Sequence, residues 1–425
     1  MNERVAFELK RSFGTACVSV ARTRFDGVEV PLLAPNTTAG FCEALALAHR
    51  ENWVVVPTGL GSKLSWTKAP ARVDFLLSTR AYAGVVAYEP GDGTLTARAG
   101  TTMAELSSRV ASGGHALTPD VPRPARATLG GVIAAAQSGS DRLRYGPVRD
   151  HVLGVQVALG DGTLARSGGR LVKNVTGYDL QRLFTGSHGS LCVILEASMR
   201  LFALPEEECV FSALAADQLE MLRLAALVLE APLRPISVRA YRADRPAPTE
   251  QWMVAVHLGG RREVLADEQA TLTKLWPACH VACGPQARSE VESQRDNLGG
   301  FDDGPLLRIE VSPQSIAPAL EVVLKELHAN GDSKNFHPRC EPGLALIEIA
   351  LRSSAYNAQQ LARMLNRLQS ALATVRGHAR LLHAPANALT EAAGEPPAGF
   401  ALMQRIRAQL DPGGVFASGR FLEAR

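Results

Sequence analysis

Long apolar segments and strong charge are the features that this 425-residue sequence lacks. No apolar run approaches the roughly 20 residues that span a bilayer. The first residues, MNERVAFELKRSFG, are charged and have no apolar core of a secretory signal. The formal net charge is +3, and no basic run is interleaved with aromatic residues. We therefore expect no transmembrane segment, no nucleic-acid partner and a cytoplasmic location.

Cysteine is sparse and scattered, which indicates reduced thiols. The seven cysteines are Cys17, Cys42, Cys192, Cys209, Cys279, Cys283 and Cys340. Cys279 and Cys283 form one CxxxC pair with no second pair nearby, so ordinary thiols are favoured over a metal site. An iron–sulfur cluster normally needs about four thiolates. The sequence therefore predicts no metal and no cluster held by this chain alone.

The composition is that of an ordered globular protein, with 46% hydrophobic and 20% charged residues. The length predicts two or three domains. A helix is expected over residues 36–50, a short strand over 54–56, and a helix from the capping-box pattern at Thr102 to Val110. Short strands alternate with isolated helices without a regular βαβ rhythm. This order predicts an α+β fold.

A glycine-rich stretch over residues 128–200 separates short apolar runs. Residues 152–159 and 191–195 are expected to form strands, and Gly160-Asp161-Gly162 is a hairpin turn signal. Glycine permits close backbone approach, so the stretch is typical of a backbone that wraps a large flat ligand. The alternative is a glycine-rich β-domain that binds no ligand.

A second glycine loop, PTGLGSK, follows the first strand at residues 57–63. Its N–H groups can form a nest for an anion such as pyrophosphate, and a plain turn is the alternative. The loop is not a Walker A motif, because no GK[ST] ends it. It also lacks the third glycine of a Rossmann fingerprint, and Pro70 interrupts the helix that such a fold needs.

The second half of the chain has a different pattern after the link LPEEE at residues 204–208. Strands are expected at 236–241, 252–258, 306–311 and 344–351, and helices at 262–276, 317–329 and 357–372. This alternation predicts an α+β domain with a ferredoxin-like plan. Arg239 and Arg242 could bind a carboxylate, but solvated charges are favoured. His337, His378 and His383 stand alone and are interpreted as surface or packed residues.

Five segments in order carry a family resemblance: GSKLSW, TLGGVIAAAQSG, RLRYGPVRDHVLG, GGRLVKNVTGYDL and GSHGSLCVILEASMRL. They resemble the PCMH-type FAD-binding domain of vanillyl-alcohol-oxidase-like flavoproteins, and within it the E subunits of bacterial glycolate oxidase (glycolate dehydrogenase). The resemblance implies an FAD-binding domain of two α+β subdomains over residues 1–204 and an α+β cap domain over 205–395. Residues 396–425 would return to the FAD domain, because DPGGVFASGR resembles the closing DPxGIFNPGR segment of the family.

The resemblance also implies the residues of the cofactor site. The loop at 57–63 would hold the pyrophosphate, and 128–131 would lie along the flavin and ribityl side. Residues 142–146 would shape the wall, and Asp150 would order Arg144 or the loop backbone. Lys173, Tyr178 and Asp179 would form an internal packing and hydrogen-bond network. The residues implied around FAD are Pro57, Thr58, Gly59, Leu60, Gly61, Ser62, Lys63, Pro119, Thr128, Leu129, Gly130, Gly131, Gly139, Arg142, Arg144, Tyr145, Gly146 and Ile194.

The function implied is that of an FAD-dependent oxidoreductase subunit. FAD is expected to be non-covalent, because Lys63 follows Gly61-Ser62 and the loop has no histidine to attach it. A second flavin subunit and an iron–sulfur subunit would join the chain to oxidise glycolate or a related small 2-hydroxy acid, with peripheral attachment to the inner membrane through those partners. The His-x-GDGN-x-His segment of catalytic relatives is missing, so no catalytic residue is assigned. A stand-alone FAD-dependent alcohol or hydroxy-acid dehydrogenase and a catalytically silent flavin-binding assembly subunit are the alternatives.

Overall fold

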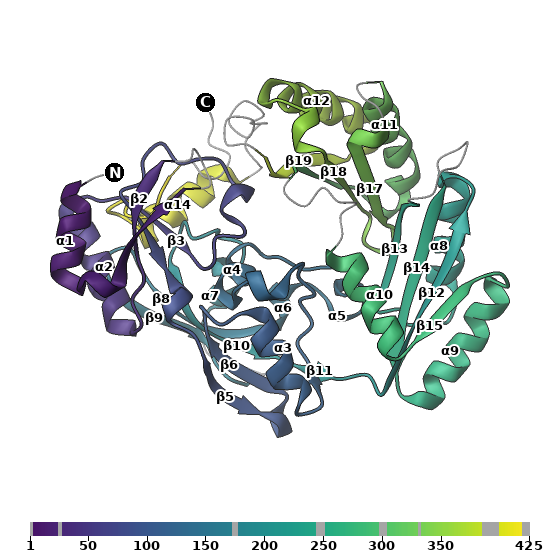
Figure 1. Ribbon diagram of the computed structural model, residues 1–425, viewed down its shortest axis with the longest axis horizontal. Helices are drawn as coiled ribbons and strands as arrows, with labels where there is room; N and C mark the ends of the chain where they lie inside the picture. The colour runs from purple at the N-terminus through teal and green to yellow at the C-terminus, as the bar shows by residue number, and fades with distance from the viewer. Residues whose placement is uncertain are drawn as a thin grey trace. The chain divides into compact units, whose positions relative to one another are not determined.

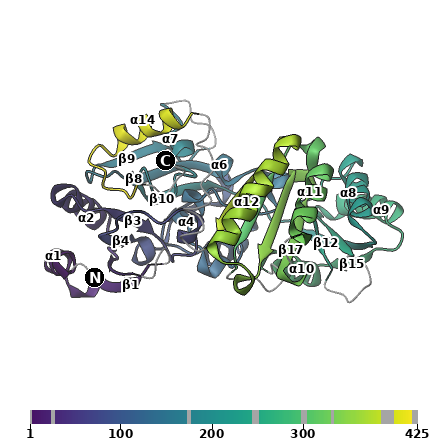
Figure 2. The ribbon, with the colours of Figure 1, turned by 90° about the horizontal axis from the view of Figure 1, so that it is seen from above.

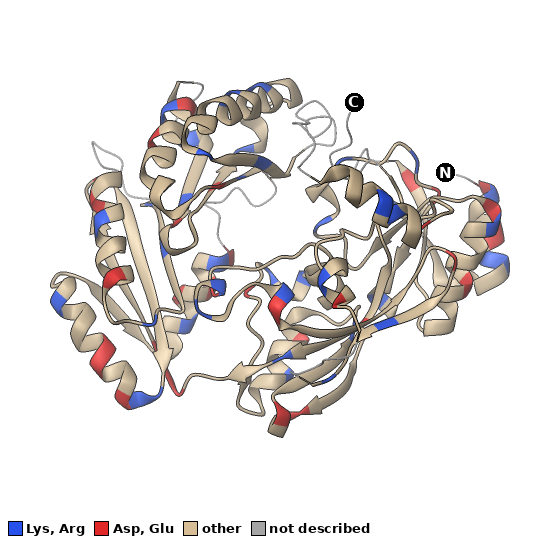
Figure 3. Ribbon diagram, turned by 180° about the vertical axis from the view of Figure 1, so that it is seen from behind, with Lys and Arg blue, Asp and Glu red and all other residues tan. Residues whose placement is uncertain are grey.

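The computed structural model describes residues 3–23, 28–171, 177–243, 251–296, 304–329, 333–384 and 399–418. The chain divides into two compact units (Figure 1). The first unit comprises Met1–Ser138, Pro147–Ala203 and Ala393–Arg425, and the second comprises Gly139–Gly146 and Leu204–Ala392. Lysine, arginine, aspartate and glutamate are interspersed over the helices and loops of each unit (Figure 3).

The first unit begins with a four-stranded sheet of order β1-β2-β4-β3. Its elements are α1 (Glu3–Phe13), β1 (Val18–Arg22), β2 (Glu29–Leu33), α2 (Thr38–Glu51), β3 (Val55–Thr58) and β4 (Phe75–Ser78). β3 and β2 both run parallel to β4. The two helices pack with the sheet in one core that includes Leu9, Phe41 and Phe75. The side chain of Thr37 caps α2 by accepting a hydrogen bond from the N–H of Gly40.

A five-stranded antiparallel sheet of order β5-β6-β10-β8-β9 completes the first unit. The strands are β5 (Val85–Glu89), β6 (Thr94–Arg98), β8 (Val152–Ala158), β9 (Leu164–Gly168) and β10 (Val193–Arg200), with a separate pair β7 (His115–Ala116) and β11 (Phe202–Ala203). The helices are α3 (Met103–Ala111), α4 (Leu129–Ala134), α6 (Val148–His151) and α7 (Leu180–Phe184). Leu106, Leu129 and Phe184 belong to the core of this sheet.

The closing segment packs into the core of the four-stranded sheet after α14 (Phe400–Leu410). The carboxylate of Asp411 accepts hydrogen bonds from the N–H groups of Val415 and Phe416, both at 2.9 Å. Phe416 is fully buried and forms a β-bridge with Val55. The last segment of the first unit therefore packs against the strand that leads into the glycine loop.

The second unit is built on an eight-stranded antiparallel sheet of order β15-β12-β14-β13-β17-β18-β16-β19. Its first six elements are β12 (Glu207–Ala215), α8 (Gln218–Glu230), β13 (Ser237–Arg242), β14 (Trp252–Gly260), α9 (Arg262–Leu275) and β15 (His280–Cys283). After α10 (Pro285–Asp296) come β16 (Leu306–Glu310), α11 (Ile316–His328), β17 (Phe336–Glu341), β18 (Leu346–Leu351), α12 (Ala358–Leu372) and β19 (His378–His383).

These elements form two successive βαββαβ repeats, each with the strand order of the ferredoxin-like plan. The repeats meet where β13 pairs with β17. Residues of α8, α9, α11 and α12 share one core with one face of the sheet, and α10 packs against Val210 and Ala255 on the other face. Figure 2 shows α11 and α12 along the sheet of the second repeat.

The predicted α+β class is confirmed by this structure. The capping box at Thr102 begins α3 as expected, and the glycine turn after β8 leads into the antiparallel strand β9. Two expectations were wrong in detail: β10 begins at Val193, and β18 begins at Leu346. The sequence did not indicate α1 or β1. No helix within the described parts of the chain has the length and apolar character to cross a membrane.

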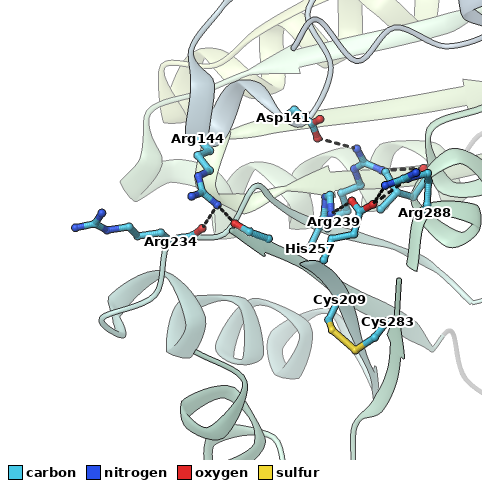
Figure 4. Close-up of polar contacts among 11 residues, drawn as sticks. Asp141, Arg144, Cys209, Arg234, Arg239, His257, Cys283 and Arg288 are labelled. Carbon is cyan, nitrogen blue, oxygen red and sulfur yellow. Dashed lines mark hydrogen bonds and ion pairs between the residues drawn. A yellow bond between two sulfur atoms is a disulfide. The ribbon is translucent and has the colours of Figure 1, made fainter. Parts of the chain in front are cut away.

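The expectation of reduced thiols was wrong for one pair of cysteines. Cys209 on β12 forms a disulfide with Cys283 on β15 (Figure 4). The two residues lie 74 positions apart and become neighbours because the strands pair in antiparallel register. Spacing along the chain could not reveal this pairing, and Cys279 remains a free thiol.

We expect the Cys209–Cys283 disulfide to contribute about 2–4 kcal/mol to the free energy of unfolding, because it closes a long loop in the unfolded chain. Cys283→Ser, or reduction of the wild type, should lower the urea unfolding midpoint, whereas the control Cys279→Ser should not. Thiol titration of the denatured, unreduced protein should find the five free cysteines. Titration of all seven thiols would contradict the pairing.

Candidate cofactor site

The first unit contains a cavity whose described lining includes five glycines and two alanines. Its lining comes from the loop after β3, from the end of β4, from α4 and from the segment that leads into β10. The lining residues are Pro57, Thr58, Gly59, Leu60, Gly61, Ser62, Lys63, Leu64, Thr79, Thr128, Gly130, Gly131, Ala134, Ala135, His188, Gly189, Cys192, Val193 and Ile194.

The loop after β3 turns its polar groups in two directions. The carbonyls of Thr58 and Gly59 accept hydrogen bonds from the hydroxyls at the end of β4. Gly61 has a φ of 78°, which a residue with a side chain rarely adopts. Within the described parts of the chain, the N–H groups of Leu60, Gly61, Ser62 and Lys63 donate no hydrogen bond. Unbonded N–H groups in a glycine turn form an anion-binding nest.

The loop and α4 approach each other closely at Gly59. A Cβ atom added there would lie 2.1 Å from Oγ1 of Thr128, so only glycine fits. Thr128 caps α4, because its Oγ1 accepts a hydrogen bond from the N–H of Gly131 at 3.3 Å. The N–H of Gly130 donates to the carbonyl of Ala99 at 2.9 Å. α4 therefore presents a smooth surface to the cavity, while the free donors come from the loop.

The electrostatics of the cavity favour a negatively charged ligand. Among the lining residues that the structure describes there is no aspartate or glutamate. Lys63 is half-buried, and its Nζ lies 3.2 Å from the hydroxyl of Ser62. Within the described parts of the chain it forms no ion pair. Burial disfavours the charged ammonium and lowers the pKa of Lys63 to about 8.

Thr58 adds a buried hydroxyl to the polar groups of the cavity. Its Oγ1 is buried and has no hydrogen-bond partner among the described residues. A buried hydroxyl with no partner is unfavourable, and a ligand oxygen could supply the missing bond. The cavity thus combines unbonded donors with a surface formed by Ala134, Ala135 and Gly130 that suits a flat ring.

Eleven of the residues implied around FAD line this cavity: Pro57, Thr58, Gly59, Leu60, Gly61, Ser62, Lys63, Thr128, Gly130, Gly131 and Ile194. Pro119 and Leu129 are buried elsewhere in the first unit. The remaining five, Gly139, Arg142, Arg144, Tyr145 and Gly146, belong to an octapeptide of the second unit that includes α5 (Arg142–Tyr145). Residues 173–175 of the family segment and Gly419 and Arg420 lie outside the described residues.

The octapeptide Gly139–Gly146 is anchored to the second unit by polar contacts (Figure 4). Arg144 donates to the carbonyls of Gly259 and Arg234. Asp150 was expected to order Arg144 or the loop backbone, and its carboxylate lies 3.7 Å from Arg182. Main-chain carbonyls of the second unit hold the guanidinium of Arg144.

Arg239 was expected to be a solvated charge, and that expectation was wrong. It is 1% exposed, and its guanidinium lies 3.7 Å from Asp141 and donates to the carbonyl of Val291 at 3.4 Å (Figure 4). Nearby, Nε2 of His257 lies 3.2 Å from a carboxylate oxygen of Glu208, and burial lowers the pKa of this imidazole.

Tyr178 was expected in an internal network, and that was wrong. Its side chain is 91% exposed. Asp179 accepts a hydrogen bond from Gln181 at 3.1 Å and lies 3.6 Å from Arg182. Lys173, the third member of the expected network, is outside the described residues.

The sequence analysis did not predict the lining residues at and just before the start of β10, which include His188, Gly189, Cys192 and Val193. A glycine on each side of the Ser187-His188 pair was the available signal. No group of three or more histidine, cysteine, aspartate or glutamate side chains within the described parts of the chain is placed to hold a metal ion.

Residues 31–168 match the family model described as FAD binding domain. The whole chain resembles the solved alkyldihydroxyacetonephosphate synthase with a TM-score of 0.73 and 14% identity, covering 98% of this chain and 86% of that one. At that identity the likeness shows the fold alone. The chain carries an FAD-binding domain, and FAD is its cofactor.

Curated relatives share this domain and are hydroxy-acid oxidoreductases by name. Glycolate oxidase subunit GlcD of Bacillus subtilis (strain 168) is 30% identical over 218 residues, which is 50% of this chain and 46% of the relative. Glycolate oxidase subunit GlcE of Escherichia coli (strain K12) is 40% identical over 130 residues, 30% of this chain and 37% of the relative. Mitochondrial D-2-hydroxyglutarate dehydrogenase of Bos taurus is 34% identical over 168 residues, 40% of this chain and 31% of the relative. The chain spans less than half the length of each relative.

The residues of the cavity fit the cofactor. FAD brings a negatively charged diphosphate, and the loop at 57–63 offers unbonded N–H groups, the hydroxyl of Thr58 and the ammonium of Lys63. The described part of the lining contains no carboxylate that would repel the diphosphate.

Affinity for FAD should weaken as the pH rises through about 8, because Lys63 then loses the charge that attracts the diphosphate. The loss should reach about tenfold, the value of one hydrogen bond to a charged group. Lys63→Arg should keep tight binding without this pH dependence, and Lys63→Met should bind weakly at every pH from 7 to 9. Flavin fluorescence titration measures both, with Lys325→Met on α11 as the control. A flat wild-type profile would contradict the role of Lys63.

Gly59→Ala should destabilise the first unit by about 1–3 kcal/mol, the usual cost of overpacking, because the new Cβ collides with Thr128. FAD affinity should fall with it. Gly91→Ala is the matched control, since a Cβ there meets no atom within 4 Å. Thermal unfolding followed by circular dichroism compares the two variants. Equal midpoints for both would show that the loop and α4 do not need this close approach.

Proposed function

We propose that the chain is the FAD-binding subunit of a flavin-dependent 2-hydroxy-acid dehydrogenase of the glycolate oxidase kind. The observation that carries the proposal is the 40% identity with the E subunit of the Escherichia coli enzyme. The match of residues 31–168 to the FAD-binding domain supports it. Identity with the D subunit of the Bacillus subtilis enzyme supports the same substrate class.

The proposed reaction converts glycolate, or a related small 2-hydroxy acid, to the 2-oxo acid. FAD, when bound, accepts the hydrogen of the substrate's α-carbon as a hydride, and a base takes the hydroxyl proton. The chain's own residues hold the dinucleotide: the N–H groups of residues 60–63 and Lys63 would bind the diphosphate, and Thr58 would donate its hydroxyl to a ligand oxygen. No residue of this chain is assigned as the base.

We further propose that the chain works in a complex with a second flavin subunit and an iron–sulfur subunit, which carries the electrons away. The two glycolate oxidase relatives are both named as subunits, and this supports an assembly. A stand-alone hydroxy-acid dehydrogenase is the second candidate, because D-2-hydroxyglutarate dehydrogenase of Bos taurus matches over 168 residues.

The visible spectrum of the purified chain, recorded with and without glycolate, tests the proposal. The isolated chain should be yellow, should release free FAD on acid precipitation, and should not bleach with glycolate. The tagged chain purified from its native host should carry additional flavin and iron, and this complex should bleach with glycolate but not with acetate, which lacks the hydroxyl. Lys63→Met is the matched control, which should lose flavin from this subunit alone.

Three other outcomes would overturn parts of the proposal. Full bleaching by a hydroxy acid in the monodisperse isolated chain would establish the stand-alone dehydrogenase. A colourless chain that rejects added FAD yet still binds its partners would indicate an assembly role. Flavin that stays with the polypeptide after acid precipitation would show covalent attachment.

A further inference from the structure

His188 adopts a backbone conformation that residues with side chains seldom take. Its φ is 49°, in the left-handed region. It lies in a tight turn between Gly186, with a φ of 85°, and Gly189, with a φ of 74°. Glycine meets such angles without strain, and the turn already uses it twice. Histidine enters this region more often than most residues with side chains, but only glycine takes it without strain.

Two hydrogen bonds hold this turn against α4. The N–H of Gly186 donates to the carbonyl of Ile133 at 3.0 Å, and the N–H of His188 donates to the carbonyl of Ala134 at 2.8 Å. These carbonyls belong to the last turn of a helix, where no later helical N–H is available to them. The turn thus caps α4, and this explains the backbone conformation but not the choice of histidine.

The same turn also contacts the glycine loop. A Cβ atom added to Gly189 would lie 3.3 Å from three side-chain atoms of Pro57, the first residue of that loop. His188 is therefore fixed between two elements that line the cavity, and it lines the cavity itself. Among the lining residues that the structure describes, His188 and Lys63 carry an ionisable side-chain nitrogen.

Strained backbone positions are retained where the side chain is used, and they cluster at ligand sites. An imidazole ring can donate an N–H to an anionic oxygen. We propose that His188 is a ligand of the FAD dinucleotide and donates a ring N–H to its diphosphate. This inference rests on the proposed placement of FAD in the cavity, and neither the family resemblance nor the cavity's glycine loop assigns such a role to this residue.

His188→Gly tests the proposal, because it keeps the backbone angles and removes only the side chain. The FAD-free variant should unfold at the same temperature as the wild type or higher. Its dissociation constant for FAD should rise about tenfold, the loss expected for one hydrogen bond to a charged group. The matched control is Arg376→Gly in the second unit, an exposed residue with a φ of 54°, which should leave FAD affinity unchanged.

An FAD dissociation constant within twofold of the wild type in a folded His188→Gly variant would overturn the proposal. If that variant does not fold, His188→Asn and His188→Ala replace it: asparagine tolerates the left-handed region and keeps an N–H donor, so it should bind FAD more tightly than alanine does. Equal affinities of these two variants would overturn the proposal. A wild-type chain that binds no FAD would instead refute the proposed function, which separates the two failures.

Discussion

The first unit depends on the close contact between Gly59 and Thr128. Gly59 follows a strand of the four-stranded sheet, and Thr128 caps a helix that packs in the core of the five-stranded sheet. Because no side chain separates them, the loop and the helix can line one cavity together. Because Gly59 has no Cβ atom, the loop of one sheet can pack against the helix of the other, and together they shape the cavity.

Charge in the cavity complements this geometry. The main-chain donors of residues 60–63 are unbonded, and the nearby lysine is held without a carboxylate. Burying an ammonium alone is unfavourable, and its lowered pKa records that cost. An anionic ligand would offset this cost by pairing with the ammonium of Lys63. The described lining therefore favours an anionic ligand, at some expense to the stability of the unliganded protein.

Local signals in the sequence predicted local structure well. The capping box at Thr102 and the glycine turn after β8 act through neighbouring residues, so the sequence alone was sufficient for them. The prediction of an anion nest in the glycine loop at 57–63 uses the same kind of local signal and stays a prediction. The disulfide and the buried Arg239 could not be predicted, because their partners come from distant strands and from an inserted octapeptide. His188 was missed because a single histidine between glycines has no signature until the backbone angles are known.

The octapeptide Gly139–Gly146 has a consequence for how such proteins can be recombined. Its flanks belong to the first unit, yet Ser140 donates to Glu341 at 2.6 Å and Asp141 faces the buried Arg239. In a fragment cut at the two ends of the long second segment, the buried Arg239 would lose its contact with Asp141, and the buried Glu341 would lose its hydrogen bond from Ser140. An exchange of the second unit between related chains must therefore include the octapeptide Gly139–Gly146 as well as the long segment. Two separated stretches of the gene would have to be transferred together.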